Sequence, residues 1–322
     1  MMPPAASIAR LGGTSMGTTW SVSLVVPTQR DLHPLHAAIQ ARLDRVVAQM
    51  STWEAGSDLM RFNRAAAGHW QPLPLQTLQV LACAQEVARA SDGAFDPTIG
   101  PLVALWGFGA QAGPRRVPDA ETLANVRARC GWQRLRWDGG ALLQPGGLEL
   151  DLSAIAKGFG VDEVVQALQA LDVDAALVEV GGELRGYGRK PDGQPWRVLV
   201  ESAPEEDAHA DHPPRVLALD DRAVATSGDR WHQYESEAGA VSHSIDPRSG
   251  RPVSRVAAAV TVVAADAMSA DAWATALTVL GHDDGLALAE RLGLAVRFLQ
   301  RHADGPVEHL SSAFATLLET QA

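Results

Sequence analysis

The stretch at residues 148–162, LELDLSAIAKGFGVD, constrains the fold more than any other part of the chain. Alternating apolar residues over 148–151 predict a half-buried strand, and the apolar spacing after them predicts an amphipathic helix with Ser153 as its N-cap. Gly158 and Gly160 fall in the first turns of that helix. A helical glycine costs up to about 1 kcal/mol relative to alanine, so the pair indicates that another surface approaches this backbone closely.

Lys157 stands beside these glycines and is one of only two lysines among 27 lysine and arginine residues. A composition that otherwise supplies arginine indicates that a compact ammonium is needed here and a planar guanidinium is not. A helix N-terminus, close-approach glycines and a point charge together suit a phosphate group. The alternative is a surface lysine on an ordinary amphipathic helix. The stretch is not a Walker A loop, because the GxxxxGK[ST] spacing is absent.

The bulk composition describes an ordinary globular protein. The chain has 322 residues, of which 46% are apolar, and this is enough for a large core in one domain or two intimate lobes. We expect a single domain over residues 12–318 and a flexible N-terminus over residues 1–11. A net charge of −11 argues against nucleic acid as a partner, because nucleic-acid binding needs a basic face.

The cysteines and the N-terminal residues bear on the cellular compartment. Cys83 and Cys130 are the only cysteines, and they form neither a disulfide framework nor a CxxC metal motif. The first residues lack the roughly 7–15-residue apolar core of a signal peptide, and no cysteine follows them as a lipid anchor would require. No apolar run approaches the length of about 18 residues that a membrane-spanning helix needs. We therefore expect a cytoplasmic protein without membrane insertion.

The order of the expected elements favours an α+β fold. Strands and helices mix without strict β-α-β alternation, and several strands join through short turns. This pattern is typical of mixed, largely antiparallel sheets packed with helices. A Rossmann fold is disfavoured, because no GxGxxG opens a helix after a strand.

A rigid, irregular segment lies at residues 94–101. It joins Asp-Pro and Gly-Pro steps, which fix the backbone without regular hydrogen bonding. It also carries the aromatic ring of Phe95 and the carboxylate of Asp96. The segment is either a wall of a ligand site or a plain loop between helices.

A candidate metal site lies in the C-terminal third of the chain. Asp271 and Thr275 are four residues apart, and so share one face of a helix that Ser269 is expected to begin. One carboxylate, one hydroxyl and a main-chain carbonyl suit Mg²⁺, which takes its other ligands from water and phosphate. The alternative is that Asp271 is a first-turn acid that only stabilises the helix dipole. His243 is either a structural hydrogen-bonding residue or a base that works near neutral pH.

Eight ordered segments of the chain resemble the sequence blocks of the FAD:protein FMN transferases, the ApbE-like family. The segments are GTSMGTTWSV, STWEAGSDLMRFN, SDGAFDPTIGPLVALWGFG, LDLSAIAKGFGVD, VEVGGELRGYG, ATSGD, HSIDPRSGRPV and ADAWATALTVLG. The resemblance runs from about residue 12 to about residue 299, which is nearly the whole chain.

The resemblance implies a T-fold-like α+β enzyme that uses Mg²⁺ and FAD. Such an enzyme moves the FMN moiety of FAD onto a threonine hydroxyl of an acceptor protein with an FMN-binding domain, and it releases AMP. The resemblance implies that FAD contacts Met16, Trp53, Ala94, Phe95, Asp96, Asp151, Lys157 and Ile245. It also implies that Asp271, Thr275 and the carbonyl of Ala154 hold the metal, that His243 is a candidate base, and that His243, Asp271 and Lys157 are catalytic.

The chain departs from the family pattern at two positions. Some relatives carry a second aspartate where this chain has Ala274, and an aspartate is common where this chain has Glu183. Two alternative functions stay open. One is an FAD pyrophosphate hydrolase that gives FMN and AMP at the same site, and the other is an FAD-binding protein without catalysis.

Overall fold

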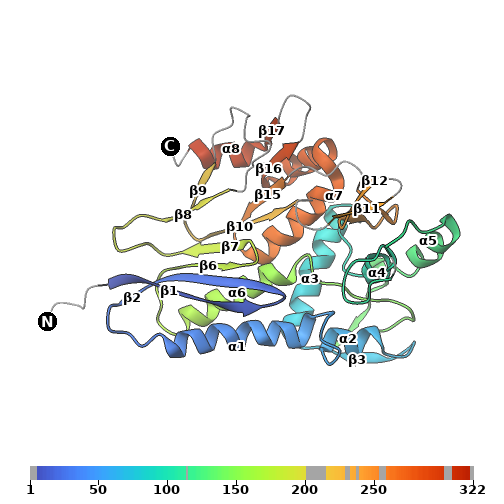
Figure 1. The fold of residues 1–322 in the computed structure, drawn as a ribbon, viewed down its shortest axis with the longest axis horizontal. Helices are drawn as coiled ribbons and strands as arrows, with labels where there is room; N and C mark the ends of the chain where they lie inside the picture. The colour runs from blue at the N-terminus through green and yellow to red at the C-terminus, as the bar shows by residue number, and fades with distance from the viewer. Residues whose placement is uncertain are drawn as a thin grey trace.

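The computed structural model describes residues 6–113, 115–200, 215–228, 233–236, 239–253, 259–300 and 307–319. Its centre is an eight-stranded sheet in the order β1-β2-β6-β7-β10-β15-β16-β17, in which each strand pairs antiparallel with its neighbours (Figure 1). The expected α+β class with antiparallel sheet is therefore confirmed. The strands are β1 Ala6–Ser15, β2 Thr18–Pro27, β6 Ala176–Val180, β7 Glu183–Tyr187, β10 Arg222–Ser227, β15 Ala259–Ala264, β16 Ala295–Gln300 and β17 Val307–Leu310.

Helices and smaller sheets surround this centre. The helices are α1 His33–Met50, α2 Asp58–Asn63, α3 Leu75–Ala90, α4 Gly100–Leu105, α5 Ala120–Arg127, the 3₁₀ turn Trp132–Arg134, α6 Ala156–Gln169, α7 Ala267–Leu292 and α8 Ser312–Glu319. The smaller sheets are β3 Trp70–Pro72 with β5 Ala141–Leu143 and β4 Trp137–Asp138, β8 Trp196–Leu199 with β9 Val216–Leu219, β11 Gln233–Ser236 with β12 Gly239–Ser242, and β13 Ile245–Asp246 with β14 Arg251–Pro252.

The large sheet is covered on both faces, because successive strand residues point to opposite sides. Ala225 of β10 and Val262 of β15 belong to one apolar cluster with residues of α7. Their neighbours Val224 and Val263 belong to a different cluster with Phe314 of α8 and residues of β8 and β9. Helix α6 lies beside α7 and packs on β6 and β7. The two long helices therefore share one face of the sheet.

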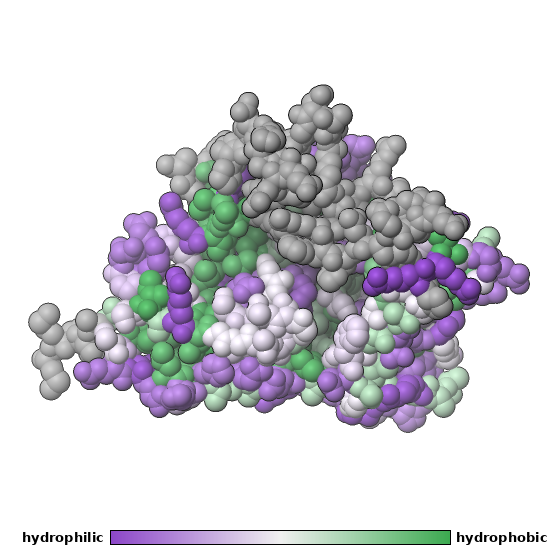
Figure 2. All heavy atoms as spheres, viewed as in Figure 1, coloured by the Kyte–Doolittle hydropathy of each residue, from purple (hydrophilic) through white to green (hydrophobic). Residues whose placement is uncertain are grey.

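Apolar side chains gather on the face shown in Figure 2 beside β8 and β9, where Leu199 and Val216 are exposed. In the described part of the chain, no helix combines the length and the apolar character that crossing a bilayer requires.

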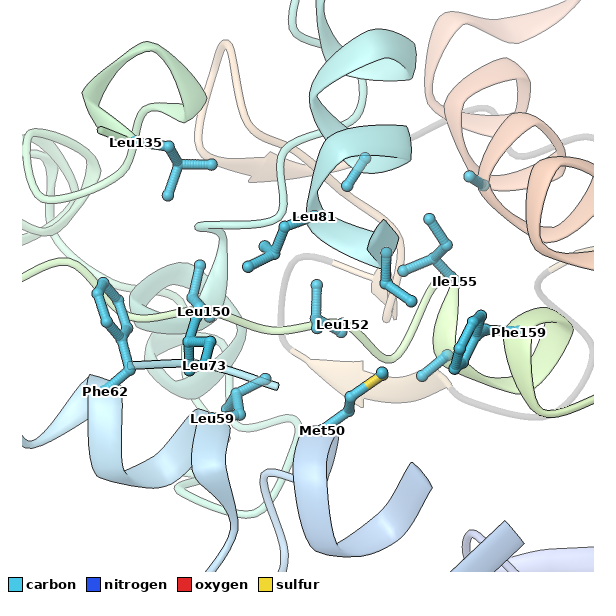
Figure 3. Packing of buried hydrophobic residues seen from close by; sticks show 14 of the residues in the cluster. Met50, Leu59, Phe62, Leu73, Leu81, Leu135, Leu150, Leu152, Ile155 and Phe159 are labelled. Carbon is cyan, nitrogen blue, oxygen red and sulfur yellow. The ribbon is translucent and has the colours of Figure 1, made fainter. Parts of the chain in front are cut away.

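A separate apolar core surrounds residues 148–159. Leu150, Leu152, Ile155 and Phe159 point into a cluster that also receives Met50 from the end of α1 (Figure 3). The cluster draws the other labelled side chains from α2, α3 and the segments between helices, namely Leu59, Phe62, Leu73, Leu81 and Leu135. The stretch that the sequence singles out is thus the buried centre of this half of the molecule.

The predicted strand at residues 148–151 is wrong, because side-chain amides take the place of a neighbouring strand. Asn63 accepts from the amide of Leu150 at 2.7 Å and donates to its carbonyl at 2.9 Å. Gln144 does the same for Leu148, at 3.2 and 3.0 Å. Among the described residues, the stretch meets another backbone at an isolated bridge between Ile99 and Glu149 and at the hydrogen bond from the amide of Asp151 to the carbonyl of Pro97 at 2.9 Å. The apolar side chains are buried as the alternation predicts, but the backbone groups between them pair with side chains instead of a neighbouring strand.

Ser153 does not cap the following helix, which is a second correction. Helix α6 begins at Ala156, and its N-cap position is Ile155, which makes no side-chain cap. The amide of Ser153 instead donates to the carboxylate of Asp151 at 2.9 Å. The helix start is therefore held by the buried turn before it, in which Ile155 and Ala156 both donate to the carbonyl of Leu152.

The expectation of a flexible N-terminus over residues 1–11 is also corrected. Residues 6–11 belong to β1, which pairs along its whole length with β2. The remaining part of that prediction, residues 1–5, lies outside the described residues. The single domain at 12–318 stays a prediction.

The close approach at the glycines of α6 is confirmed. A Cβ on Gly158 would lie 2.2 Å from the carbonyl oxygen of Ala267 and 2.9 Å from Cβ of Asp271, both on α7. A Cβ on Gly160 would lie 3.1 Å from Sδ of Met16. Asp162, further along α6, accepts from the amides of Ala267 and Met268 at 3.1 and 2.9 Å. Helix α6 therefore touches α7 backbone to backbone at Gly158, and its Asp162 binds the first amides of α7.

We expect Gly158→Ala to destabilise the protein by about 3 kcal/mol or more, because the new methyl group meets a backbone carbonyl that cannot move without separating α6 from α7. Denaturant unfolding measures the change. Gly140→Ala is the control, since a Cβ there has no neighbour within 4 Å. Equal unfolding free energies for the two variants would contradict the close packing.

Candidate active site

One cleft of about 680 Å³ opens where α6 and α7 meet the segments after α1 and α3 and the loop before β13. The structure brings every predicted site residue to its walls, from distant parts of the chain. They are Met16, Trp53, Ala94, Phe95, Asp96, Asp151, Ala154, Lys157, His243, Ile245, Asp271 and Thr275. Their individual roles stay predictions, but they share one cavity.

Lys157 reaches into the polar end of this cleft. Its ammonium forms an ion pair with Oε1 of Glu183, the first residue of β7. Its stem packs on the turn before β7, because a Cβ on Gly181 would lie 3.2 Å from Cδ of Lys157. Lys157 is therefore a half-buried, ion-paired side chain of the cleft wall, and its role toward a phosphate stays a prediction.

Asp271 faces the same end of the cleft from α7. It is only 6% exposed, and its Oδ2 accepts from the amide of Gly158 at 3.0 Å. Helix α7 begins at Ala267 with Asp266 as N-cap, which accepts from the amide of Ser269 at 2.8 Å. The expectation that Ser269 begins the helix is corrected. Asp271 lies beyond the first turn, and the alternative of a first-turn acid is wrong.

The electrostatics of this cluster follow from burial. Burial raises the pKa of Glu183 to about 8, the nearby charge of Asp271 adds to the rise, and Lys157 opposes it. Burial likewise raises the pKa of Asp271, again against the effect of Lys157. Burial alone would lower the pKa of Lys157, but the charges of Asp271 and Glu183 outweigh it and raise that pKa. Two buried carboxyl groups thus compete for the charge of one ammonium.

The oxygen donors near Asp271 fit a hard divalent cation. No hydrogen bond from the described residues reaches its Oδ1. Thr275 lies one helical turn further on the same cleft wall, and Ala154 lines the cleft beside Lys157. In the described ranges no three His, Cys, Asp or Glu side chains gather around a possible metal position, and the carboxylate in the predicted set is that of Asp271. Such a set suits Mg²⁺ that keeps water and phosphate oxygens as its other ligands.

Ala274, where some relatives carry an aspartate, is buried at 1% exposure in the apolar cluster between α7 and the sheet. It does not line the cleft. This chain therefore supplies no oxygen ligand at that position.

The segment at residues 94–101 forms a fixed wall of the cleft. Oδ1 of Asp96 accepts from the amide and the hydroxyl of Thr98 at 2.8 and 2.7 Å, and its Oδ2 accepts from the amide of Trp132 at 3.2 Å. Both carboxylate oxygens are thus used to hold the segment in place. Burial raises the pKa of Asp96, which these hydrogen bonds oppose. The segment lines the cleft in a fixed conformation, and its role as a ligand wall stays a prediction.

Trp53 stands at the rim of the cleft and is 73% exposed. Its backbone is nevertheless fixed, since its amide and that of Glu54 donate to Oγ of Ser51 at 3.1 and 3.3 Å. A large aromatic ring left in solvent on a fixed turn suits stacking against a planar ligand.

His243 lies in a bend between β12 and β13, with its ring 6.5 Å from the ring of Phe108 in an edge-on arrangement. Phe108, Ile99, Val103 and Ile245 also line the cleft, and Phe108 brings apolar surface next to His243. The charged cluster and the histidine therefore line one cavity.

Sequence reasoning missed Glu183 as a site residue. The sequence does carry a signal for it, because Glu183 directly follows a buried apolar strand and the turn Gly181-Gly182. A glutamate is rarely buried in such a place unless it has a charged partner. Glu183 also stands out in the sequence as a glutamate where an aspartate is common in relatives. Other polar wall residues, Thr18, Ser153, Thr226 and Ser227, carry no comparable signal.

Comparisons with known proteins agree with this geometry. The ApbE family model matches residues 16–298. A FAD:protein FMN transferase of Vibrio cholerae is 38% identical over 310 residues, which cover 96% of this chain and 92% of the relative. The apo structure of the Pseudomonas stutzeri flavinyl transferase ApbE superposes with a TM-score of 0.90 at 40% identity, with 97% of each chain covered. The Vibrio cholerae flavin transferase ApbE gives a TM-score of 0.88 at 37% identity, covering 97% of this chain and 99% of that one. The expected ApbE-like architecture is confirmed.

The raised pKa of Glu183 predicts a pH-dependent stability. The folded protein holds this proton more tightly than the unfolded chain, so the stabilisation is complete below the ordinary pKa of 4.5 and is lost as the pH rises toward about 8. Relative to Glu183→Gln, the wild-type protein should lose on the order of a few kcal/mol of unfolding free energy between pH 5 and pH 8.5. Denaturant unfolding with EDTA at both pH values measures it.

The matched control is Glu163→Gln, because Glu163 is also buried and ion-paired, to Arg42, but lies outside the cleft. Its unfolding free energy should follow that of the wild-type protein across the two pH values. Parallel pH profiles for wild type and Glu183→Gln would show that Glu183 carries no such proton.

Proposed function

The chain belongs to the ApbE family, and we propose that it transfers the FMN moiety of FAD onto a threonine hydroxyl of an acceptor protein in a Mg²⁺-dependent reaction that releases AMP. The observation that carries the proposal is one cleft with a charged end at Lys157 and Asp271 and a flat aromatic rim at Trp53. A pyrophosphate and a ring system joined in one molecule match those two ends.

The charged end would bind the pyrophosphate of FAD. Lys157 lies in the first turn of α6, where the helix dipole and the ammonium both favour an anion. The ion pair with Glu183 holds the ammonium at the cleft wall. The flavin would then extend past Phe95 toward Trp53, since both rings line the same cavity.

The transfer step is a substitution at phosphorus. The threonine oxygen forms a bond to the phosphorus on the FMN side, the bond from that phosphorus to the bridging oxygen breaks, and AMP leaves with the electron pair. His243 is the candidate base for the hydroxyl proton, because its imidazole lines the same cleft as Lys157 and can take a proton near neutral pH. Lys157 would offset the charge that develops on the phosphates. When bound near Asp271 and Thr275, Mg²⁺ supplies further charge neutralisation at the phosphate oxygens.

Membership of the ApbE family does not establish the finer parts of this proposal. The FMN-binding domain of the acceptor, its threonine and the cytoplasmic location stay predictions. The hydrolase alternative uses the same cleft with water as nucleophile. The alternative of an FAD-binding protein without catalysis does not explain why Asp271 and Glu183 are buried beside one lysine, which costs stability and brings no packing advantage.

The experiment is incubation with FAD, Mg²⁺ and a candidate acceptor domain, followed by intact mass measurement and AMP quantification. We expect the acceptor to gain the mass of one FMN and equimolar AMP to appear, both abolished by EDTA. Free FMN and AMP with an unmodified acceptor would favour the hydrolase. Binding of FAD without AMP release would favour the non-catalytic protein.

Asp271→Asn is the matched variant for this assay. The amide oxygen can still accept from the amide of Gly158, so the contact between α6 and α7 is kept while the charge is lost. AMP release should fall by more than about tenfold at saturating Mg²⁺ with little change in melting temperature. Near-normal AMP release would remove Asp271 from the proposed metal site.

Lys157→Arg should reduce kcat/KM for FAD by about tenfold or more although the charge is kept, because the planar guanidinium does not fit between Gly181 and Glu183. The control is Lys190→Arg, since Lys190 is the only other lysine and pairs with Asp192 outside the cleft. An unchanged Lys157→Arg enzyme would contradict the interpretation that this position requires a compact ammonium.

A further inference from the structure

Glu183 is paired at only one of its two carboxyl oxygens. Oε1 accepts from the ammonium of Lys157, but Oε2 is buried and has no hydrogen-bond partner in the described chain. Glu183 is 3% exposed and lines the cleft. A buried carboxyl oxygen without a partner costs stability, so a structural role alone does not account for this side chain.

The arrangement of Lys157 is asymmetric. It pairs with Glu183, yet it forms no ion pair with Asp271 within 4.0 Å, although both residues are described and Asp271 is close enough to raise the pKa of Lys157. Asp271 in turn is held by the amide of Gly158 through Oδ2. The ammonium thus stands near two acids and is bound to only one of them.

The backbone fixes which acid Lys157 binds. Glu183 opens β7 directly after a tight turn in which Gly181 and Gly182 have φ of +60° and +104°. Its register partner is Val180 at the end of β6, and β7 is an inner strand between β6 and β10. The turn and the strand pairing fix the backbone position of Glu183 in the sheet. Thr18 packs against the turn, because a Cβ on Gly181 would lie 2.8 Å from Cγ2 of Thr18.

We propose that Glu183 is a positioning residue: it holds the ammonium of Lys157 away from Asp271, so that Oδ1 of Asp271 stays open to a divalent cation while Lys157 faces the phosphates. The proposal rests on the proposed function. Glu183 does this in either protonation state, because a carboxyl oxygen accepts from the ammonium in both. If the carboxyl group of Glu183 is removed, the remaining acid close to Lys157 is Asp271. An ion pair between Lys157 and Asp271 would compete with the divalent cation.

The test is Mn²⁺ binding followed by electron paramagnetic resonance, with no flavin present, in wild type and Glu183→Leu. Leucine removes the carboxyl group that accepts from Lys157 and fills the buried space. We expect Glu183→Leu to weaken Mn²⁺ binding by about tenfold or more. Glu163→Leu, which removes a buried, ion-paired glutamate outside the cleft, should leave Mn²⁺ affinity within about twofold of wild type.

A double-mutant cycle separates positioning from simple loss of negative charge. In a Lys157→Met background no ammonium can occupy Asp271, so adding Glu183→Leu should change Mn²⁺ affinity by less than about twofold. An equal loss in both backgrounds would overturn the proposal, as would unchanged affinity in Glu183→Leu alone. A wild-type protein that binds no Mn²⁺ at millimolar concentration would overturn both this proposal and the metal site. Thermal melts of each variant exclude unfolding as the cause.

Discussion

The contact between α6 and α7 at Gly158 is the interaction on which the rest of the structure depends. The carbonyl of Ala267 occupies the space of a side chain at Gly158, and the amide of Gly158 donates to Asp271 at 3.0 Å. Four residues later Asp162 accepts from the first amides of α7. Because one face of the large sheet lies under both helices, this contact fixes the sheet, the helix pair and the charged end of the cleft relative to one another.

The same contact explains why charge is buried at this place. Asp271 can lose its water because the amide of Gly158 replaces one hydrogen bond, and Glu183 because Lys157 replaces another. Neither replacement is complete, and burial raises the pKa of both acids. A core built for stability alone would carry apolar residues here, as α7 does at Ala274. The cluster of Lys157, Glu183 and Asp271 therefore lowers the stability of the fold, and it leaves charged groups in the cleft that can bind an anion and a cation.

The other walls of the cleft are irregular backbone that side chains hold in place. Gln144 and Asn63 bond both backbone groups of Leu148 and Leu150, Asp96 ties its segment to Thr98 and Trp132, and Ser51 fixes the turn of Trp53. Regular strands would place alternate residues on opposite faces, whereas these segments can turn several neighbouring residues toward one cavity. Rigid irregular walls of this kind suit a ligand with unlike parts.

The sequence alone determined the class of the fold, the residues that gather in the cleft and the need for close approach at Gly158 and Gly160. These follow from local patterns and from ordered blocks that can be recognised along the chain. Local patterns gave wrong predictions for a strand at residues 148–151 and for helix starts at Ser153 and Ser269. In each case the backbone groups bind side chains that the local pattern does not reveal. The amides that replace the strand come from Asn63 and Gln144, and the true cap of α7 is Asp266. Only the tertiary structure decided that α7 is the surface facing Gly158 and that Glu183 is the partner of Lys157. The reason is distance along the chain: Asp271 is 113 residues from Gly158 and Glu183 is 26 from Lys157, so no local spacing encodes either contact.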